Sequence, residues 1–266
     1  MSPTYPTRDW YAHPLYYDVV FDADTPAEAD FLEGAARRFG RSGGRRVLEP
    51  ACGTGRLVRA LARRGWWAAG FDASPSMLAY ARTELHSAGL PARLFQARLE
   101  EFAARAHFDL VHCLLGSFRY LGDGRDARAH LRAVAGALRP GGLYVLGLHL
   151  ADLGAPSPTR ERWVGERGGL RVVCNIQGWP PDPTRRRERV RARIAAFESG
   201  AQSPFERFET EWSFRTYDAA QLRALLASVP ALELAAVRGY DYALDEESEL
   251  SDERLDQVLI LRRRSE

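Results

Sequence analysis

Two acidic side chains and two glycines in the first third of the chain have the types and the spacing of a ligand-binding loop. The stretch VLEPACGTGRL, residues 47–57, passes through Glu49 and then places Gly53 and Gly55 before a helical-looking segment. Glycines between a strand and a helix let a ligand lie against bare backbone. Asp72 ends the next apolar run, and an acid at that place can accept hydrogen bonds from both hydroxyls of a ribose. The pattern therefore predicts a nucleoside site.

A phosphate-containing ligand does not suit this loop. The dinucleotide fingerprint needs a third glycine, but Val58 stands at that position. A phosphate-cradling loop needs a lysine, and the chain contains none. Glu49 would repel a pyrophosphate, whereas it suits a cation. The loop is therefore expected to bind a nucleoside that carries positive charge and no phosphate.

Alternating strands and helices would position these residues. Apolar runs predict strands at residues 46–48, 66–72, 92–99, 108–115 and 143–150. Helical spacing predicts helices at residues 31–39, 57–64, 74–89 and 127–139, the last of them ended by Pro140 and two glycines. This alternation implies parallel pairing with right-handed crossovers, and hence a doubly wound α/β sheet.

The pattern changes after Asp152, because apolar and polar residues now alternate. Val190, Ala192 and Ile194 fall on one face of a predicted strand, and the arginines between them fall on the other. Such strands are predicted at residues 170–179, 187–197 and 205–217, followed by a helix at 218–228 and closing strands at 232–242 and 256–264. We therefore predict an α/β fold with a doubly wound, mostly parallel seven-stranded sheet and an antiparallel β insert after the fifth strand.

Composition narrows the class of protein. The 266 residues are 45% hydrophobic and 27% charged, which is typical of a globular chain. A formal net charge of +2 gives no field that would attract nucleic acid or a membrane. The three cysteines, Cys52, Cys113 and Cys174, have neither disulfide-framework nor metal-site spacing. Without an apolar signal-peptide core near the N-terminus, the protein is expected to be cytoplasmic, without a metal site or a membrane span.

Five segments resemble the class I S-adenosylmethionine-dependent methyltransferases in order and spacing. They are VLEPACGTGRL, GFDASPSML, ARLFQARLEEF, FDLVHCLLGSFRYL and LRPGGLYVLGLH, and they span most of residues 45–149. The resemblance implies a Rossmann-like methyltransferase fold, with S-adenosyl-L-methionine as cofactor and S-adenosyl-L-homocysteine as product. It divides the chain into an N-terminal helical lid or cap segment (1–44), the cofactor-binding core (45–152), the insert (153–217) and the closing helix and strands (218–266).

The resemblance also implies which residues contact the cofactor. They are Tyr17, Glu49, Ala51, Cys52, Gly53, Thr54, Gly55, Asp72, Ala73, Met77, Arg98, Leu99 and Leu114. The glycine loop would face the methionine part, Asp72 the ribose, and Ala73 and Met77 the adenine, while Leu114 and Leu115 would lie beside the transferred methyl group. Met77 fits the apolar core equally well.

Three positions invite other interpretations. Ala51 replaces a glycine that many relatives have, so its backbone is expected to keep a negative φ. Arg98 stands where the family often has an acid that accepts the adenine amine, and arginine has no acceptor. Glu100, Glu101 or a backbone carbonyl is expected to take over that contact. Cys52 is expected to be a small buried filler rather than a nucleophile.

Three segments lie where an acceptor would bind, beyond the carboxyl ends of the strands. The N-terminal segment, with Tyr11 and Tyr17, is expected from the resemblance to cover the cofactor as a lid. His149 and Asp152 follow the fifth strand at the rim, and the insert would form a roof. His149 is the candidate general base, and Tyr17 is the second catalytic candidate. A structural histidine and plain aromatic packing are the respective alternatives.

A small-molecule acceptor, such as an amine, a sugar or a specialised metabolite, is the favoured substrate. The tetrad typical of methyltransferases that act on exocyclic amines of bases is absent, because LLGSFR follows the fourth strand. The run RRRERVRAR is explained by a solvated strand face, whereas phosphate binding wants a broad basic patch. Methylation of nucleic acid or protein, transfer of an aminopropyl group and a non-catalytic cofactor-binding or docking subunit are the alternatives. Exposed strand edges of the insert predict a possible homodimer.

Overall fold

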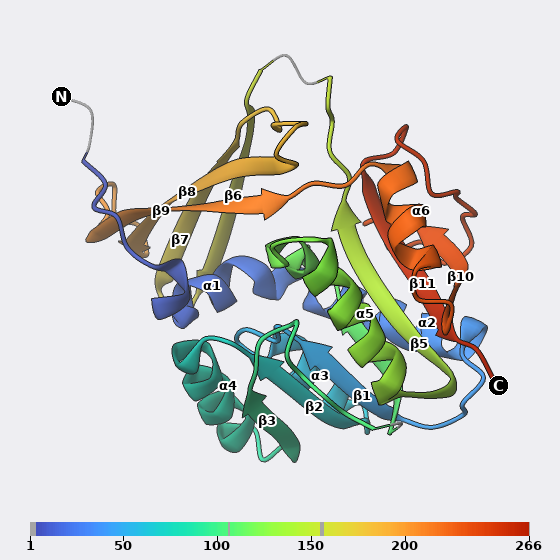
Figure 1. Cartoon of the computed structure of the whole chain (residues 1–266). Helices are drawn as coiled ribbons and strands as arrows, with labels where there is room; N and C mark the ends of the chain where they lie inside the picture. The colour runs from blue at the N-terminus through green and yellow to red at the C-terminus, as the bar shows by residue number, and fades with distance from the viewer. Residues whose placement is uncertain (1–3, 106, 155–156, 266) are drawn as a thin grey trace.

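Two β-sheets organise the computed structural model, which describes residues 4–105, 107–154 and 157–265 (Figure 1). The larger sheet has the strand order β10-β11-β5-β4-β1-β2-β3. Its strands are β1 (Arg46–Pro50), β2 (Trp67–Asp72), β3 (Ala92–Gln96), β4 (Phe108–Cys113), β5 (Leu138–His149), β10 (Leu232–Arg238) and β11 (Asp256–Arg263). Strands β1 to β5 pair in parallel, and β11 is antiparallel to both β5 and β10.

Helices cover both faces of this sheet, so the predicted doubly wound α/β fold is confirmed. The helices are α2 (Thr25–Phe39), α3 (Arg56–Arg63), α4 (Pro75–Ser87), α5 (Gly124–Ala137) and α6 (Ala219–Ala227). Val47 and Val145 pack with α2, α3 and α4 in one core cluster. Their neighbours Leu48 and Leu146 pack with α5 and α6 in another. Successive strand residues point to opposite faces, which is why these strands are apolar almost throughout.

The predicted antiparallel insert is confirmed as a separate four-stranded sheet with the order β6-β7-β8-β9. Its strands are β6 (Thr159–Arg167), β7 (Leu170–Gly178), β8 (Arg187–Glu198) and β9 (Glu206–Arg215). The polar strand β6 was not foreseen, because it shows little apolar alternation. Val190, Ala192 and Ile194 are buried as predicted. Figure 1 shows this sheet standing beyond the carboxyl ends of the parallel strands.

The N-terminal segment runs between the two sheets. It contains the short helical turns η1 (Trp10–Ala12) and η2 (Asp22–Asp24) on either side of helix α1 (Pro14–Phe21), which lies below the insert sheet in Figure 1. Before them, Arg8 N donates to Glu209 O at 2.9 Å, and Glu209 N donates to Pro6 O at 2.9 Å. The chain's own segment thus covers the β9 edge, so a dimer formed through the edges of this sheet would have to use β6.

Two element boundaries differ from the sequence prediction for local reasons. Helix α5 ends at Ala137, and β5 begins at Leu138, before Pro140. A proline disfavours helical backbone in the residue before it, and Leu138 pairs with Phe108 of β4. Helix α2 begins at Thr25, six residues earlier than predicted. None of the described helices is both long and apolar enough to cross a bilayer.

Candidate active site

A small pocket lies over the glycine loop, at the carboxyl ends of β1 and β4. Its free volume is about 30 Å³, which is space for roughly one water molecule. Its walls are Tyr17, Glu49, Pro50, Ala51, Cys52, Gly53, Thr54, Arg56, Leu57, Cys113, Leu114, Leu115 and Ser117. Of the cofactor contacts expected from the resemblance, those of the lid, the first strand, the fourth strand and the glycine loop up to Thr54 meet here, whereas Gly55 and Asp72 do not line the pocket.

The glycine loop contains a backbone conformation that was predicted wrongly. Ala51 has φ of +52°, like Gly53 at +51° and Gly55 at +70°, and does not keep the negative φ expected of an alanine. The left-handed conformation costs an L-residue about 1–2 kcal/mol. Hydrogen bonds from Cys52 N to Phe71 O at 2.9 Å and from Gly55 N to Cys52 O at 2.8 Å hold the turn. The tertiary bonds therefore override the local preference at Ala51.

Asp72, at the end of β2, binds the glycine loop directly. Its Oδ2 accepts from Gly53 N at 2.8 Å, and its Oδ1 accepts from Ser74 N at 2.8 Å. Burial raises the pKa of Asp72, although these backbone N–H groups act to lower it. Each carboxylate oxygen has lone pairs beyond the one used, so the side chain retains capacity to accept ribose hydroxyls. Ser74 is the side-chain cap of α4, accepting from Met77 N at 3.3 Å.

Glu49, at the end of β1, is a buried acid with an unused oxygen. It is 9% exposed, and its Oε2 has no hydrogen-bond partner within the described residues. Burial raises the pKa of Glu49 to about 8, against a lowering effect of Arg56. His112 lies 4.0 Å away, from Nδ1 to Oε1, and burial lowers its pKa to about 3. An unpartnered buried carboxylate beside the glycine loop fits the ammonium group of a methionine moiety.

The four residues expected around the adenine are not brought into this pocket. Met77 is 1% exposed and packed inside the molecule. Leu99 packs against the core cluster of α5 and α6. Arg98 points to solvent and pairs with Glu100, from Nε to Oε1 at 2.6 Å. Ala73 O accepts from Gln96 Nε2 at 3.0 Å.

Aromatic residues of the N-terminal segment close the pocket from above. Tyr17 Cε1 lies 3.9 Å from the position that a Cβ would take at Gly53, and its ring packs on Phe21 with centroids 4.5 Å apart. Tyr11 shares a hydroxyl–hydroxyl hydrogen bond with Tyr120. Burial raises the pKa of Tyr17 well above its usual range. Its phenol therefore stays protonated, which suits a cover and argues against a base.

His149 stands at the rim of the pocket and has partners that sequence reasoning missed. Its Nδ1 hydrogen-bonds to Asp256 Oδ1, and its ring stacks on Tyr240 with centroids 5.2 Å apart. The hydrogen bond from His149 holds the pKa of Asp256 below its usual value. Tyr240 donates to Leu114 O at 2.8 Å, so this group adjoins the pocket wall. The missed signal was the register of β11, which places Asp256 opposite His149.

Asp152, the other rim residue predicted from the sequence, and Trp163 of the predicted roof have different partners. Asp152 Oδ1 accepts from Gly154 N at 2.9 Å and closes a local turn. Trp163 of the insert packs edge-on against Phe21 of α1, with centroids 5.2 Å apart. Asp152 is therefore a turn residue, and Trp163 joins the roof to the lid.

Comparison with known proteins agrees with this geometry. Residues 47–142 match the model of a family described as a methyltransferase domain. The match, the doubly wound sheet and the glycine loop identify residues 47–142 as a methyltransferase domain of the class I, S-adenosylmethionine-dependent type. S-adenosylmethionine is the cofactor of that class.

Particular relatives match different lengths of the chain. Over 135 residues it is 29% identical to a protein of Geobacillus sp. (strain WCH70) named as a methyltransferase, covering 50% of this chain and 55% of that one. The chain spans about half the length of the curated relatives it matches. The solved sugar N-methyltransferase of Streptoalloteichus sp. superimposes with a TM-score of 0.72 at 23% identity, covering 100% of this chain and 96% of that one. An amino pentose methyltransferase of Micromonospora echinaspora gives a TM-score of 0.69 at 20% identity, covering 99% and 100%. The likeness in fold therefore includes the insert.

Proposed function

We propose that this protein methylates a small polar molecule, with the amine of an amino sugar as the favoured acceptor. The observation that carries the proposal is the pocket itself, which sets the unpartnered Oε2 of Glu49 beside the glycine loop. The rim above it carries the His149–Asp256 pair. The acceptor class is supported by two structures with the same fold across nearly the whole chain, whose names are those of a sugar N-methyltransferase and an amino pentose methyltransferase.

The chain's own residues suit the parts of S-adenosylmethionine. Glu49 would accept the ammonium group, Asp72 would accept ribose hydroxyls, and Tyr17 would cover the loop and exclude water. The cofactor supplies an electrophilic methyl carbon on a positively charged sulfur. Transfer from such a centre is an in-line displacement, so positioning of the acceptor and exclusion of water are the main tasks of the protein.

His149 would serve as the general base. Because its Nδ1 is hydrogen-bonded to Asp256, its Nε2 is the ring nitrogen left to take a proton from the acceptor. Asp256 would keep the imidazole in that tautomer and stabilise the cation that forms. An ammonium acceptor must lose a proton before its nitrogen lone pair can attack, and a hydroxyl acceptor needs the same help more strongly.

Incubation with S-adenosylmethionine and a panel of acceptors tests the proposal. The panel should contain amino sugars, their N-acetylated forms, phenols and short RNA, with mass spectrometry of the products. We expect amino sugars to gain one methyl group and their N-acetylated forms to remain unchanged. Methylation of RNA alone, or tight cofactor binding without turnover on any acceptor, would overturn the proposal. We also propose a cytoplasmic location, supported by the free and buried state of Cys52, Cys113 and Cys174.

A further inference from the structure

The lid helix and the roof sheet form one packed unit, which we call the cap (residues 5–21 with β6 to β9). Trp10 and Val19 share a core cluster with Val172, Ile194 and other residues of the roof. At Gly165 of β6 the two backbones touch, because a Cβ there would lie 2.0 Å from Val19 O. Only glycine permits so close an approach. The lid therefore cannot slide along the roof without rebuilding this contact.

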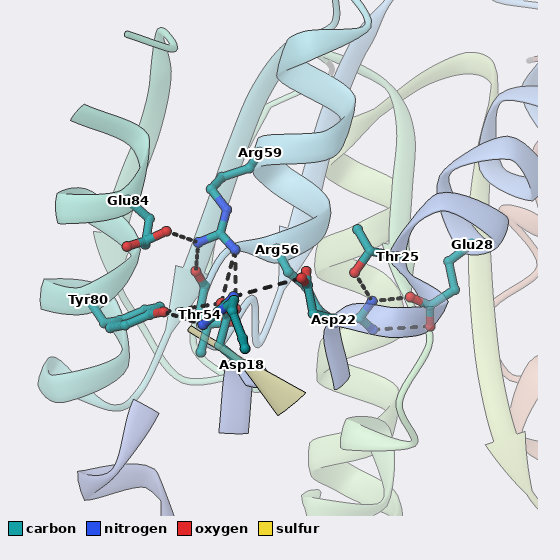
Figure 2. A network of polar contacts seen from close by, with 10 residues as sticks. Asp18, Asp22, Thr25, Glu28, Thr54, Arg56, Arg59, Tyr80 and Glu84 are labelled. Atoms are coloured by element: carbon teal, nitrogen blue, oxygen red, sulfur yellow. Dashed lines mark hydrogen bonds and ion pairs between the residues drawn. The ribbon is translucent and has the colours of Figure 1, made fainter. Parts of the chain in front are cut away.

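Asp18 is one of several polar contacts that connect the cap to the cofactor domain beneath it, beside the Tyr11–Tyr120 hydroxyl pair and the Arg119–Glu188 ion pair. Asp18 of α1 is completely buried. Arg59 of α3 donates through Nη2 to both its oxygens at 3.2 Å, and the Tyr80 hydroxyl of α4 donates to Oδ2 at 3.1 Å. Arg167 of β6 donates to Oδ2 at 2.8 Å. Figure 2 shows Arg59 and Tyr80 converging on Asp18 from two different helices.

The partners of Asp18 fall into two groups, one in the cap and one in the cofactor domain. Arg167 lies in the cap together with Asp18, so that bond survives if the cap moves as a whole. Arg59 and Tyr80 lie in the cofactor domain, so their bonds must break. Breaking them removes partners from a buried charge, which is strongly unfavourable. Burial alone would raise the pKa of Asp18, but Thr54, Arg59 and Arg167 together hold it below its usual value, so the carboxylate stays charged at neutral pH.

A neighbouring ion pair serves for comparison, because both of its residues lie outside the cap. Arg56 of α3 pairs with Glu28 of α2 and donates to Thr25 at 3.0 Å (Figure 2). Both helices belong to the cofactor domain. Movement of the cap would leave this pair intact, whereas it would separate Asp18 from Arg59.

Asp18 is also adjacent to the cover of the pocket. Tyr17, the preceding residue, lies over Gly53. Arg59 Nη1 donates to Thr54 O of the glycine loop at 3.4 Å. The pocket has a free volume of about 30 Å³ in this arrangement, far less than a nucleoside with an amino-acid side arm needs. Movement of the cover would widen this part of the site for such a ligand.

We propose that Asp18 is a positioning residue that latches the lid and the roof, moving together as one cap, onto the cofactor domain and so holds Tyr17 over the glycine loop. The inference rests on the proposed function only for the identity of the ligand in the pocket. Opening lifts the roof with the lid. An acceptor held under the roof consequently slows release of the cofactor product.

Hydrogen exchange of the ligand-free full chain tests the coupled movement. The variants are Asp18→Asn, Arg59→Gln and the matched control Arg162→Gln, which removes an exposed arginine from the same strand as Arg167. In Asp18→Asn and Arg59→Gln we expect amide exchange about tenfold faster in α1 and β6 together, with β4 and β5 unchanged. Arg162→Gln should exchange like the parent. Faster exchange in α1 with β6 unchanged, or no change in either, would overturn the proposal.

A global loss of stability is distinguishable, because it would accelerate exchange in β4 and β5 as well. Tyr80→Phe then replaces the harsher variants, since it keeps the ring and the buried charge and removes only the hydroxyl, which donates to Asp18 and accepts from Arg167 Nη2 at 3.0 Å. It should accelerate α1 and β6 alone, and failure to do so would contradict the latch.

Stopped-flow release of S-adenosylhomocysteine supplies the functional readout. Asp18→Asn should raise both the association and the dissociation rate constants by about tenfold, and should leave the equilibrium constant nearly unchanged. An unchanged dissociation rate in a variant that binds the product would refute the latch. If the parent protein binds neither S-adenosylmethionine nor its product, the proposed function fails, while the exchange experiment still decides whether the cap is latched.

Discussion

The proposed cofactor half and the proposed acceptor half of the site are built in different ways. The first uses one short stretch, in which Glu49, the glycine loop and Asp72 end two adjacent parallel strands. The second gathers Tyr11, Tyr120, His149 and Asp256 from distant segments. The first half is formed by residues that are close in the sequence. The second half is formed only when distant segments pack together, and the proposed acceptor chemistry depends on that packing.

The two acids of the cofactor half also differ from each other. Asp72 has two backbone N–H donors, whereas Glu49 has an oxygen without a partner. Asp72 therefore organises the loop before any ligand arrives. Under the proposed function, Glu49, whose Oε2 has no partner among the described residues, would gain one when a cation binds.

The largest expected effect lies in the acceptor half. His149→Ala should reduce kcat by about 10³-fold, because it removes the general base, and cofactor affinity should stay within about twofold. Steady-state kinetics with the best acceptor, together with calorimetric binding of the cofactor, measure both quantities. Asp256→Asn should have a smaller effect, and the double variant should be no worse than His149→Ala. Additive losses would mean that the two side chains do not act as a pair.

A second prediction concerns the cofactor half. Asp72→Ala should weaken S-adenosylmethionine binding by about 3 kcal/mol, roughly 100-fold, because charge-assisted hydrogen bonds are lost. Isothermal titration measures this, and Ser74→Ala is the matched control because it removes the neighbouring α4 cap and keeps the carboxylate. Equal affinity in the parent and Asp72→Ala would remove Asp72 from the ribose contact.

Release of a proton on ligand binding should distinguish the role of Glu49 from that of Asp72. The pKa of Glu49 is raised to about 8 by burial, so the folded protein without ligand holds its proton at pH 7. Binding of an ammonium group favours the carboxylate, and that proton should be released. Affinity should therefore rise by up to about tenfold per pH unit as pH increases toward 8, and level off above it. Titration at one pH in buffers of different ionisation enthalpy measures the proton count, and Glu49→Gln should abolish it.

The raised pKa of Glu49 also makes the free energy of unfolding depend on pH. The unfolded chain has the ordinary glutamate pKa of 4.5, and the folded one has a value of about 8. The folded state therefore binds more protons between these values, and the contribution of Glu49 to stability is lost as pH rises from 4.5 through 8. Urea unfolding measures the free energy of unfolding of the parent and of Glu49→Gln across this pH range. The difference between the two proteins should be smallest at the acid end of the range.

The smallest expected effect is at Ala51. Because this residue has a left-handed φ of +52°, Ala51→Gly should stabilise the fold by about 0.5–1 kcal/mol, after the entropy cost of glycine is deducted. Ala73→Gly is the control, since Ala73 has no positive φ, and it should destabilise by a similar amount. Destabilisation by both changes in urea would show that the loop tolerates Ala51 without strain.

The sequence predicts the local structure around the glycine loop well, because each part of it depends on neighbours in the chain. Glycines between a strand and a helix, an acid at each strand end and Ser-Pro before α4 are local signals, and the doubly wound sheet follows from alternating elements. The φ of Ala51 is an exception. Alanine prefers negative φ, and the hydrogen bond from Cys52 to Phe71 that overrides this preference joins separate strands.

The pairing of His149 with Asp256 and the burial of Asp18 could not be predicted in the same way. His149 and Asp256 are 107 residues apart, and the partners of Asp18 lie 41, 62 and 149 residues away, in elements whose register or crossing is set by packing. By itself, the sequence determined the strands and helices of the doubly wound sheet and predicted where a nucleoside with positive charge would bind, since local backbone preference and apolar patterning decide those. Only the tertiary structure decided which base meets which acid at the rim and how the lid joins the roof, because those contacts exist only after distant surfaces have packed.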